Sequence, residues 1–174
     1  MPIIIAIITA LGGAYFWFNR MKNARDASET LFEAANDVRL AARRFGFRRK
    51  VNIHPAGSID DPRLAVASIV AALMQIDRAW EREMSDGLSL QLQSIYVVKR
   101  EEAEEMVTFA RWMSEQCGTK HEAVRRVAKR LATLKGKEVV VNIRQMADRL
   151  VAKPDGSYSD PAQDAIEALR RQFR

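Results

Sequence analysis

The residue types that most often carry catalysis are scarce in this chain and lie far apart in the sequence. The chain has two histidines, His54 and His121, and one cysteine, Cys117. His54 lies in a segment with no helical pattern and His121 in the first turn of an expected helix, so no nucleophile and base pair up. A thiol in an apolar helical stripe is typical of a core residue. We therefore predict no catalytic residues and a non-enzymatic protein.

The net charge of +6 is concentrated in one segment rather than spread over a face. Residues 20–50 hold nine Lys and Arg residues against four acids, and the other residues are nearly neutral together. A nucleic-acid-binding domain would carry a basic patch on its folded surface. The sequence also has no phosphate-binding glycine loop. We expect neither a nucleic-acid partner nor a small-molecule substrate.

Two tryptophans and one arginine are candidates for contact with a partner protein. Trp and Arg are common hot-spot residues at protein interfaces. We therefore name Trp80, Arg111 and Trp112 as candidate anchors. The alternative, that the tryptophans belong to the core of the domain, is equally compatible with their spacing.

The N-terminal residues form an uncharged, apolar run, and the interpretation of the other elements depends on it. Residues 2–18 carry no charge, and 17 helical residues reach about 25 Å, which is near the short end of what spans a bilayer. A secretory signal peptide would place positive charge before the apolar run and a small-residue cleavage site after it. Here aromatic residues close the run, which favours a single transmembrane helix over residues 1–19.

The residues after this run predict its orientation. Aromatic side chains followed by cations are typical of a membrane interface, and cations on one side place that side in the cytoplasm. We expect a single-pass protein of the bacterial inner (cytoplasmic) membrane, with its N-terminus outside and its C-terminal domain in the cytoplasm. The expected interface residues are Tyr15, Trp17, Arg20, Lys22 and Arg25.

Small residues cluster within the expected transmembrane helix. Such residues let another helix approach closely in lipid, so they favour a helix-packing face. The alternative is that they are tolerated without a packing role. The candidate packing residues are Ala10, Gly12, Gly13 and Ala14.

Residues 20–50 predict a basic juxtamembrane helix with a thin, alanine-rich apolar stripe, ending near Gly46. The cations of residues 43–50 suit the C-terminal end of a helix. They would instead meet anionic lipid headgroups if the helix bent down onto the membrane. The first interpretation is the simpler one. Residues 51–61 lack a helical pattern and are expected to form a linker.

Residues 62–174 predict a compact, all-α helical bundle. Asp61 and Pro62 start the first helix, and further helices are expected over residues 88–98, 100–116, 119–134, 138–152 and 160–173. Residues 119–122 form a capping box, and Ser159 precedes the last helix. Residues 139–141 are β-branched and would suit a strand, but no partner strand is visible.

The same region resembles the TerB-like domain, a family named for tellurite resistance. The resemblance rests on short motifs at residues 71–77, 81–89 and 99–107, where an apolar helix is followed by an acidic loop and an acidic helix start. Residues 146–161 resemble the second half of the family, where Asp-Gly precedes a capped final helix. The resemblance implies a helical TerB-like domain over residues 62–174 behind a membrane anchor.

The family's paired acidic loops are proposed metal sites, so the resemblance implies that a divalent metal is the only candidate cofactor. The corresponding acids are Asp77 and Glu81 in the first loop and Asp155 and Asp160 in the second. The first loop departs from the family pattern because it lacks Asp-Gly. The alternative assigns Asp155 to a turn and Asp160 to a helix cap.

Two functions follow as expectations. The first is a membrane-anchored accessory or scaffold subunit that binds or bridges larger membrane protein complexes, with respiratory-chain complexes as the first guess. The second, implied by the resemblance, is a metal-binding, stress-response or co-chaperone-related module. The absence of a catalytic constellation and the small-residue membrane face favour the first.

Overall fold

A computed structural model describes residues 35–48, 52–134 and 139–173. Within these ranges all regular structure is helical and no strand is present, which confirms the predicted all-α class for this part of the chain. The chain divides into two compact units, Met1–Asp37 and Val38–Arg174. The predicted transmembrane helix, with its packing and interface residues, lies outside the described ranges. No helix within those ranges is long and apolar enough to span a bilayer.

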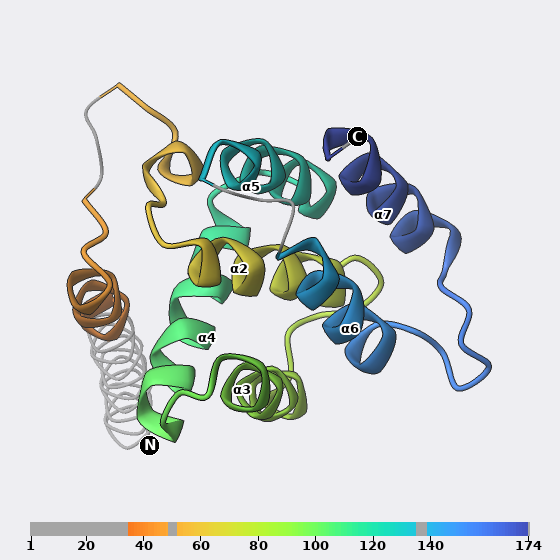
Figure 1. Cartoon of the computed structure of the whole chain (residues 1–174), viewed down its shortest axis with the longest axis horizontal. Helices are drawn as coiled ribbons and strands as arrows, with labels where there is room; N and C mark the ends of the chain where they lie inside the picture. Colours follow the sequence, from red (N-terminus) through yellow and green to blue (C-terminus); the bar gives the residue numbers. More distant parts are fainter. Residues whose placement is uncertain (1–34, 49–51, 135–138, 174) are drawn as a thin grey trace, which may run out of the picture. The chain divides into compact units, whose positions relative to one another are not determined.

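Helix α2, Pro62–Met74, is the central element of the second unit (Figure 1). Asp61 caps it by accepting a hydrogen bond from the Arg63 backbone N–H at 2.8 Å, and Pro62 occupies its first turn as predicted. Every residue from Leu64 to Met74 is buried. A helix that is apolar on all faces must be surrounded, and α2 packs against four others: α3 (Arg82–Tyr96), α4 (Arg100–Glu115), α5 (Lys120–Leu134) and α6 (Val140–Leu150).

Capping residues mark the end of α4 and the start of α5. Gly118 follows α4 with a φ of +71°, a left-handed conformation that glycine adopts without a steric penalty. The Thr119 hydroxyl then accepts a hydrogen bond from the Glu122 backbone N–H at 3.2 Å. The Glu122 carboxylate pairs with Arg125 and Arg126.

Helix α3 starts earlier than predicted, whereas α6 lies within the helix predicted over residues 138–152. Helix α3 begins at Arg82, six residues before the predicted start at Leu88, because Glu81 serves as its N-cap and the polar first turn carries little apolar pattern. Helix α6 forms where Val139, Val140 and Val141 would suit a strand. Its buried face packs on α2 and α3, and this tertiary contact overrides β-propensity.

Residues 38–44 continue a helix that ends in a glycine cap. Gly46 has a φ of +67°, and the Phe47 backbone N–H donates to the Ala42 carbonyl at 2.8 Å. This is the hydrogen bond of a Schellman motif. Gly46 therefore ends the helix at the predicted place.

The segment expected to be a linker contains the short 3₁₀ helix η1, Pro55–Ser58, which packs against α5. Ile59, which follows it, is fully buried. Arg130 of α5 donates to the Ile59 carbonyl at 2.7 Å and forms an ion pair with Asp60 at 2.5 Å. The last helix, α7 (Asp160–Gln172), starts at the expected place, but its N-cap is Ser159 and not Asp160, and it also packs against α5.

Candidate functional site

The three candidate partner-binding residues occupy different environments. Trp112 lies in an aromatic cluster, with its ring centroid 5.8 Å from that of Phe47 and 5.6 Å from that of Phe109. The Trp80 indole N–H donates to the Ser85 hydroxyl at 2.9 Å. Both indoles are half-buried and pack against the core. Only Arg111 is exposed, and it pairs with Glu115 at 3.4 Å.

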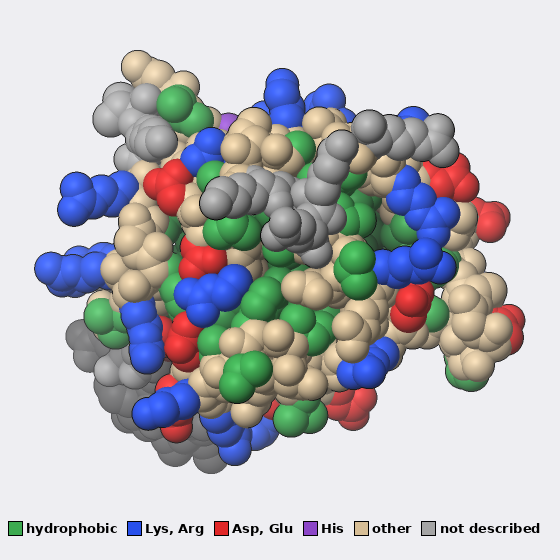
Figure 2. Space-filling view, viewed as in Figure 1, with side chains coloured by type: hydrophobic (Ala, Val, Ile, Leu, Met, Phe, Trp, Pro, Cys, Tyr) green, Lys and Arg blue, Asp and Glu red, His purple; other side chains and the backbone are tan. Residues whose placement is uncertain are grey.

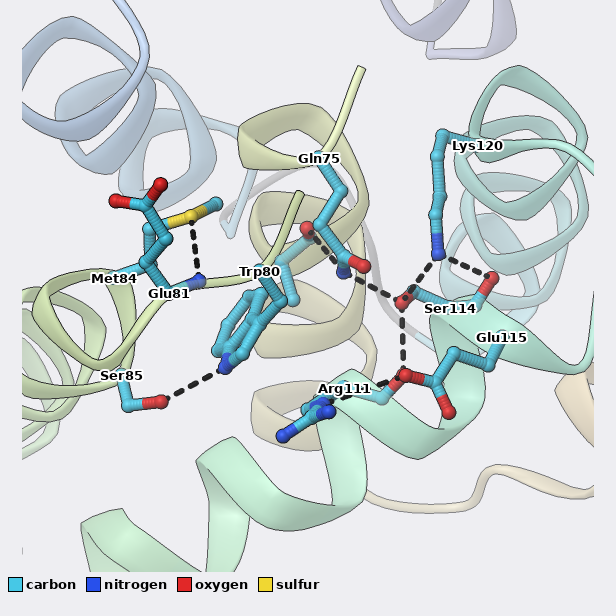
Figure 3. Close-up of polar contacts among 10 residues, drawn as sticks. Gln75, Trp80, Glu81, Met84, Ser85, Arg111, Ser114, Glu115 and Lys120 are labelled. Carbon is cyan, nitrogen blue, oxygen red and sulfur yellow. Dashed lines mark hydrogen bonds and ion pairs between the residues drawn. The ribbon is translucent and has the colours of Figure 1, made fainter. Parts of the chain in front are cut away.

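A buried polar network links α2, α4 and α5 (Figure 3). The Gln75 side-chain amide donates to the Ser114 hydroxyl at 2.7 Å and to the Ala71 carbonyl at 2.9 Å. The Lys120 ammonium donates to the same hydroxyl at 3.3 Å. The hydroxyl itself donates to the Arg111 carbonyl at 2.8 Å.

A serine beside a lysine can form a nucleophile–base pair, and burial lowers the pKa of Lys120. The geometry of Ser114 argues for a structural role instead. A hydroxyl has one proton to donate and two lone pairs to accept with, and three partners use all of this capacity. The side chain of Ser114 is also buried away from any substrate. This network was not predicted from the sequence. The pattern that could have indicated it is a glutamine and a serine at the ends of two apolar helical faces.

The candidate metal-binding acids have separate hydrogen-bonding roles, although two loops do meet. Asp77 accepts a hydrogen bond from the Ser159 hydroxyl at 2.5 Å, which brings the loop after α2 to the start of α7, beside Asp160. Asp155 accepts from the Ser157 backbone N–H and hydroxyl at 2.9 and 2.7 Å, and these bonds lower the pKa of Asp155. Glu81 is the N-cap of α3. Among the described residues, no three His, Cys, Asp or Glu side chains are grouped closely enough to hold a metal ion.

The rings of both histidines contact backbone atoms of other residues. His54 accepts from the Ala56 backbone N–H through Nδ1 at 3.2 Å, and its Nε2 lies 3.2 Å from the Gln116 carbonyl. Because Nδ1 accepts, Nε2 is the ring nitrogen that can donate to the Gln116 carbonyl. The Nε2 of His121 lies 3.0 Å from the Pro161 carbonyl. Cys117 is buried, and burial raises the pKa of its thiol, so it is a poor nucleophile.

A cavity of about 360 Å³ lies between α6 and α7 and was not expected from the sequence. Figure 2 shows hydrophobic side chains beside Lys and Arg side chains over the region of these helices. Tyr158 lines the cavity from the connecting loop. Helix α7 contributes Ile166, Leu169 and Arg170. Helix α6 contributes Val140, Val141, Ile143, Arg144 and Ala147.

The polar groups of this cavity lie near its edge. Tyr158 donates a hydrogen bond to Asp148, and burial followed by this bond raises the pKa of Tyr158 to about 12. Arg144 faces the same carboxylate at 3.9 Å, with its side chain 72% exposed. The cavity is thus an aliphatic hollow with cations at its edge.

Comparison with protein-family models, with curated proteins and with solved structures found no match to this chain. The resemblance to the TerB-like domain therefore rests on the short sequence motifs alone.

Proposed function

We propose that this protein is a non-enzymatic, membrane-anchored accessory or scaffold subunit. Its N-terminal helix holds it in the bacterial inner membrane, and its helical domain contacts a larger membrane protein complex on the cytoplasmic side. The observation that carries the proposal is the uncharged run of residues 2–18, which is followed by Arg20, Lys22 and Arg25. A run of this length and polarity costs less in lipid than in water.

The helical domain supports the proposal through the roles of its polar groups. The side chains that could do chemistry there, Ser114, His54 and His121, are engaged in structural hydrogen bonds. What remains for function in the described part of the chain is its surface. The domain therefore suits contact with other molecules better than covalent chemistry, and respiratory-chain complexes are the first assemblies to examine.

Crosslinking in intact membranes, followed by purification in mild detergent, tests this function. We expect the full-length chain to migrate with a larger complex. Leucine in place of Gly12 and Gly13 should release it, because a larger side chain separates packed helices in lipid. Leucine in place of Ile5 is the matched control and should leave the complex intact. Migration of the wild-type chain only as a lone monomer would contradict the proposal.

One contact favours a second candidate, a metal-binding, TerB-like stress-response module. Asp77 bonds to Ser159, which precedes Asp160 in the sequence, so the two segments that carry these acids meet. A hard cation needs about six oxygen ligands, and backbone carbonyls and water would have to complete the set. Calcium or zinc should then raise the melting temperature of the chain, and Asp77→Asn should abolish that rise. An unchanged melting temperature with both metals would exclude this candidate.

A further inference from the structure

The cavity between α6 and α7 exists because these two helices are held by different neighbours. Helix α6 packs against α2 and α3, whereas α7 packs against α5, and the two do not pack closely against each other. Figure 1 shows α7 beside α5, and α6 beside the C-terminal half of α2. The resulting hollow of about 360 Å³ falls at the small end of the roughly 300–1,000 Å³ of known ligand pockets.

The wall of the cavity determines the kind of molecule that fits. Ile143, Ile166 and Leu169 are buried in the core and present aliphatic surface to the hollow. Val141 lines the same hollow with 68% of its surface exposed, which places it at the mouth. The hydroxyl of Tyr158 is already bonded to Asp148. The wall therefore offers little to a polar ring such as a nucleobase and suits an aliphatic chain.

The charges at the edge determine the head group of that molecule. Arg144 and Arg170 both line the cavity, none of the described residues in its wall is acidic, and the carboxylate of Asp148 contacts Arg144. The contact between Arg144 and Asp148 is long, at 3.9 Å, and exposed to solvent, so it constrains the guanidinium little. Arginine forms paired hydrogen bonds with a carboxylate, and its planar fork suits that group better than a neutral one.

We propose that the α6–α7 cavity binds a free aliphatic carboxylate of medium chain length. The tail fills the hollow lined by Ile143, Ile166 and Leu169, and the carboxylate pairs with Arg144 and Arg170 at the mouth. This site is separate from the membrane anchor and does not depend on the scaffold function. It gives the domain a small-molecule ligand that its sequence motifs do not indicate.

Octanoate labelled with ¹³C at the carboxyl carbon is the probe. The full-length chain is placed in phosphatidylcholine nanodiscs, and empty nanodiscs measure partition of the probe into lipid. We expect a saturable change in the carboxyl ¹³C signal, at one probe per chain, beyond that of the empty discs. Carbonate washing of membranes tests the scaffold proposal separately. If the washing releases the chain, the scaffold proposal fails. The cavity proposal is then tested by the same titration in buffer without nanodiscs.

Two pairs of matched variants test the parts of the site. Arg144→Gln with Arg170→Gln should weaken binding about tenfold or more, because charge-assisted bonds are lost. Arg125→Gln, on a side chain of α5 with similar exposure, should not. Val141→Trp should block the mouth, whereas Leu90→Trp, on the exposed face of α3, should leave binding unchanged.

Octanol tests the head group directly and should bind about tenfold or more weakly than octanoate. No saturable signal beyond the empty discs would overturn the proposal. So would equal affinity for octanol and octanoate, or unchanged binding in the double arginine variant. Weaker binding in both tryptophan variants would show that the probe is not located at the cavity, and would overturn it as well.

Discussion

The hydroxyl of Ser114 is the point where three helices share hydrogen bonds. It accepts from Gln75 of the turn after α2 and from Lys120 of α5, while it belongs itself to α4. Gln75 is buried and would lose one of its two acceptors without this hydroxyl, and the half-buried Lys120 would keep only its longer contact with the Ser114 carbonyl at 3.5 Å. Polar groups buried in this way stabilise a single arrangement of helices only while every donor is satisfied.

Removing this hydroxyl should destabilise the domain well beyond the loss of one ordinary hydrogen bond. Ser114→Ala leaves the donors of Gln75 and Lys120 without this acceptor, and we expect a cost of about 1–3 kcal/mol in the free energy of unfolding. Urea denaturation of the full-length chain measures it. Thr108→Ala, which removes an exposed hydroxyl bonded within its own helix, is the control and should cost much less. Equal costs for the two variants would contradict the role of the network.

Tyr158 makes stability depend on alkaline pH. Burial and the bond to Asp148 raise its pKa from 10.0 to about 12. The folded state therefore holds the phenol proton more tightly than the unfolded chain. The resulting stabilisation is complete below pH 10 and is lost as the pH rises from 10 towards 12.

We expect the free energy of unfolding of the wild type to fall between pH 10 and pH 12, and to fall less steeply in Tyr158→Phe. Urea denaturation of both proteins at pH values on either side of 10 measures the difference. Deprotonation of lysines adds the same background to both curves. Parallel curves for the wild type and Tyr158→Phe would contradict a raised pKa of Tyr158 in the folded state.

At the scale of elements, the segment after the first unit is held to α4 by an aromatic contact. The ring centroid of Phe47 lies 5.0 Å from that of Phe109 in an edge-on arrangement, a favourable geometry for aromatic rings. Arg44 adds an ion pair with Glu105 at 2.8 Å, which is partly exposed and contributes little. Phe47 also lies 5.8 Å from the ring of Trp112, so it forms the aromatic part of an attachment to which the buried Ala41 and the half-buried Phe45 contribute as well.

Phe47→Ala should release this segment without unfolding the bundle. We expect trypsin to cut after Arg48 several-fold faster, roughly in line with a loss of 1–2 kcal/mol of local stability. Mass spectrometry of short digests identifies the cut. Leu40→Ala, at a residue 51% exposed on the helix that precedes Phe47, is the control and should leave the rate unchanged. An unchanged rate in Phe47→Ala would mean that other contacts hold the segment.

Elements with strong local signals could be predicted from the sequence, whereas the start of α3, which lacks them, could not. Helix α2 combines a capping Asp61, Pro62 and a continuous apolar face, and α5 begins at a capping threonine. The start of α3 was placed too late because residues 82–87 are mostly polar, with Met84 as their one apolar side chain, and include Gly87. The helix predicted over residues 138–152 did form, and packing against α2 and α3 stabilises it although residues 139–141 would suit a strand.

The candidate sites were less predictable than the helices, for a similar reason. The cavity arises from the separate neighbours of α6 and α7, and no residue type or spacing marks such a gap. The sequence left Trp80 and Trp112 open between surface anchors and core residues, and the structure places both half-buried against the core. Exposure of a tryptophan depends on how helices pack, so its presence alone does not define an interface.

At the scale of the whole molecule, the scaffold function requires that the N-terminal run remain in lipid and tether the helical domain. Carbonate extraction of membranes containing the full-length chain, with N-terminal sequencing of the retained polypeptide, tests this most directly. We predict that the wild type stays with the membrane and retains residues 2–18, whereas a variant lacking those residues is released. Release of the wild type by carbonate, or a retained polypeptide that begins after Phe18, would contradict the account.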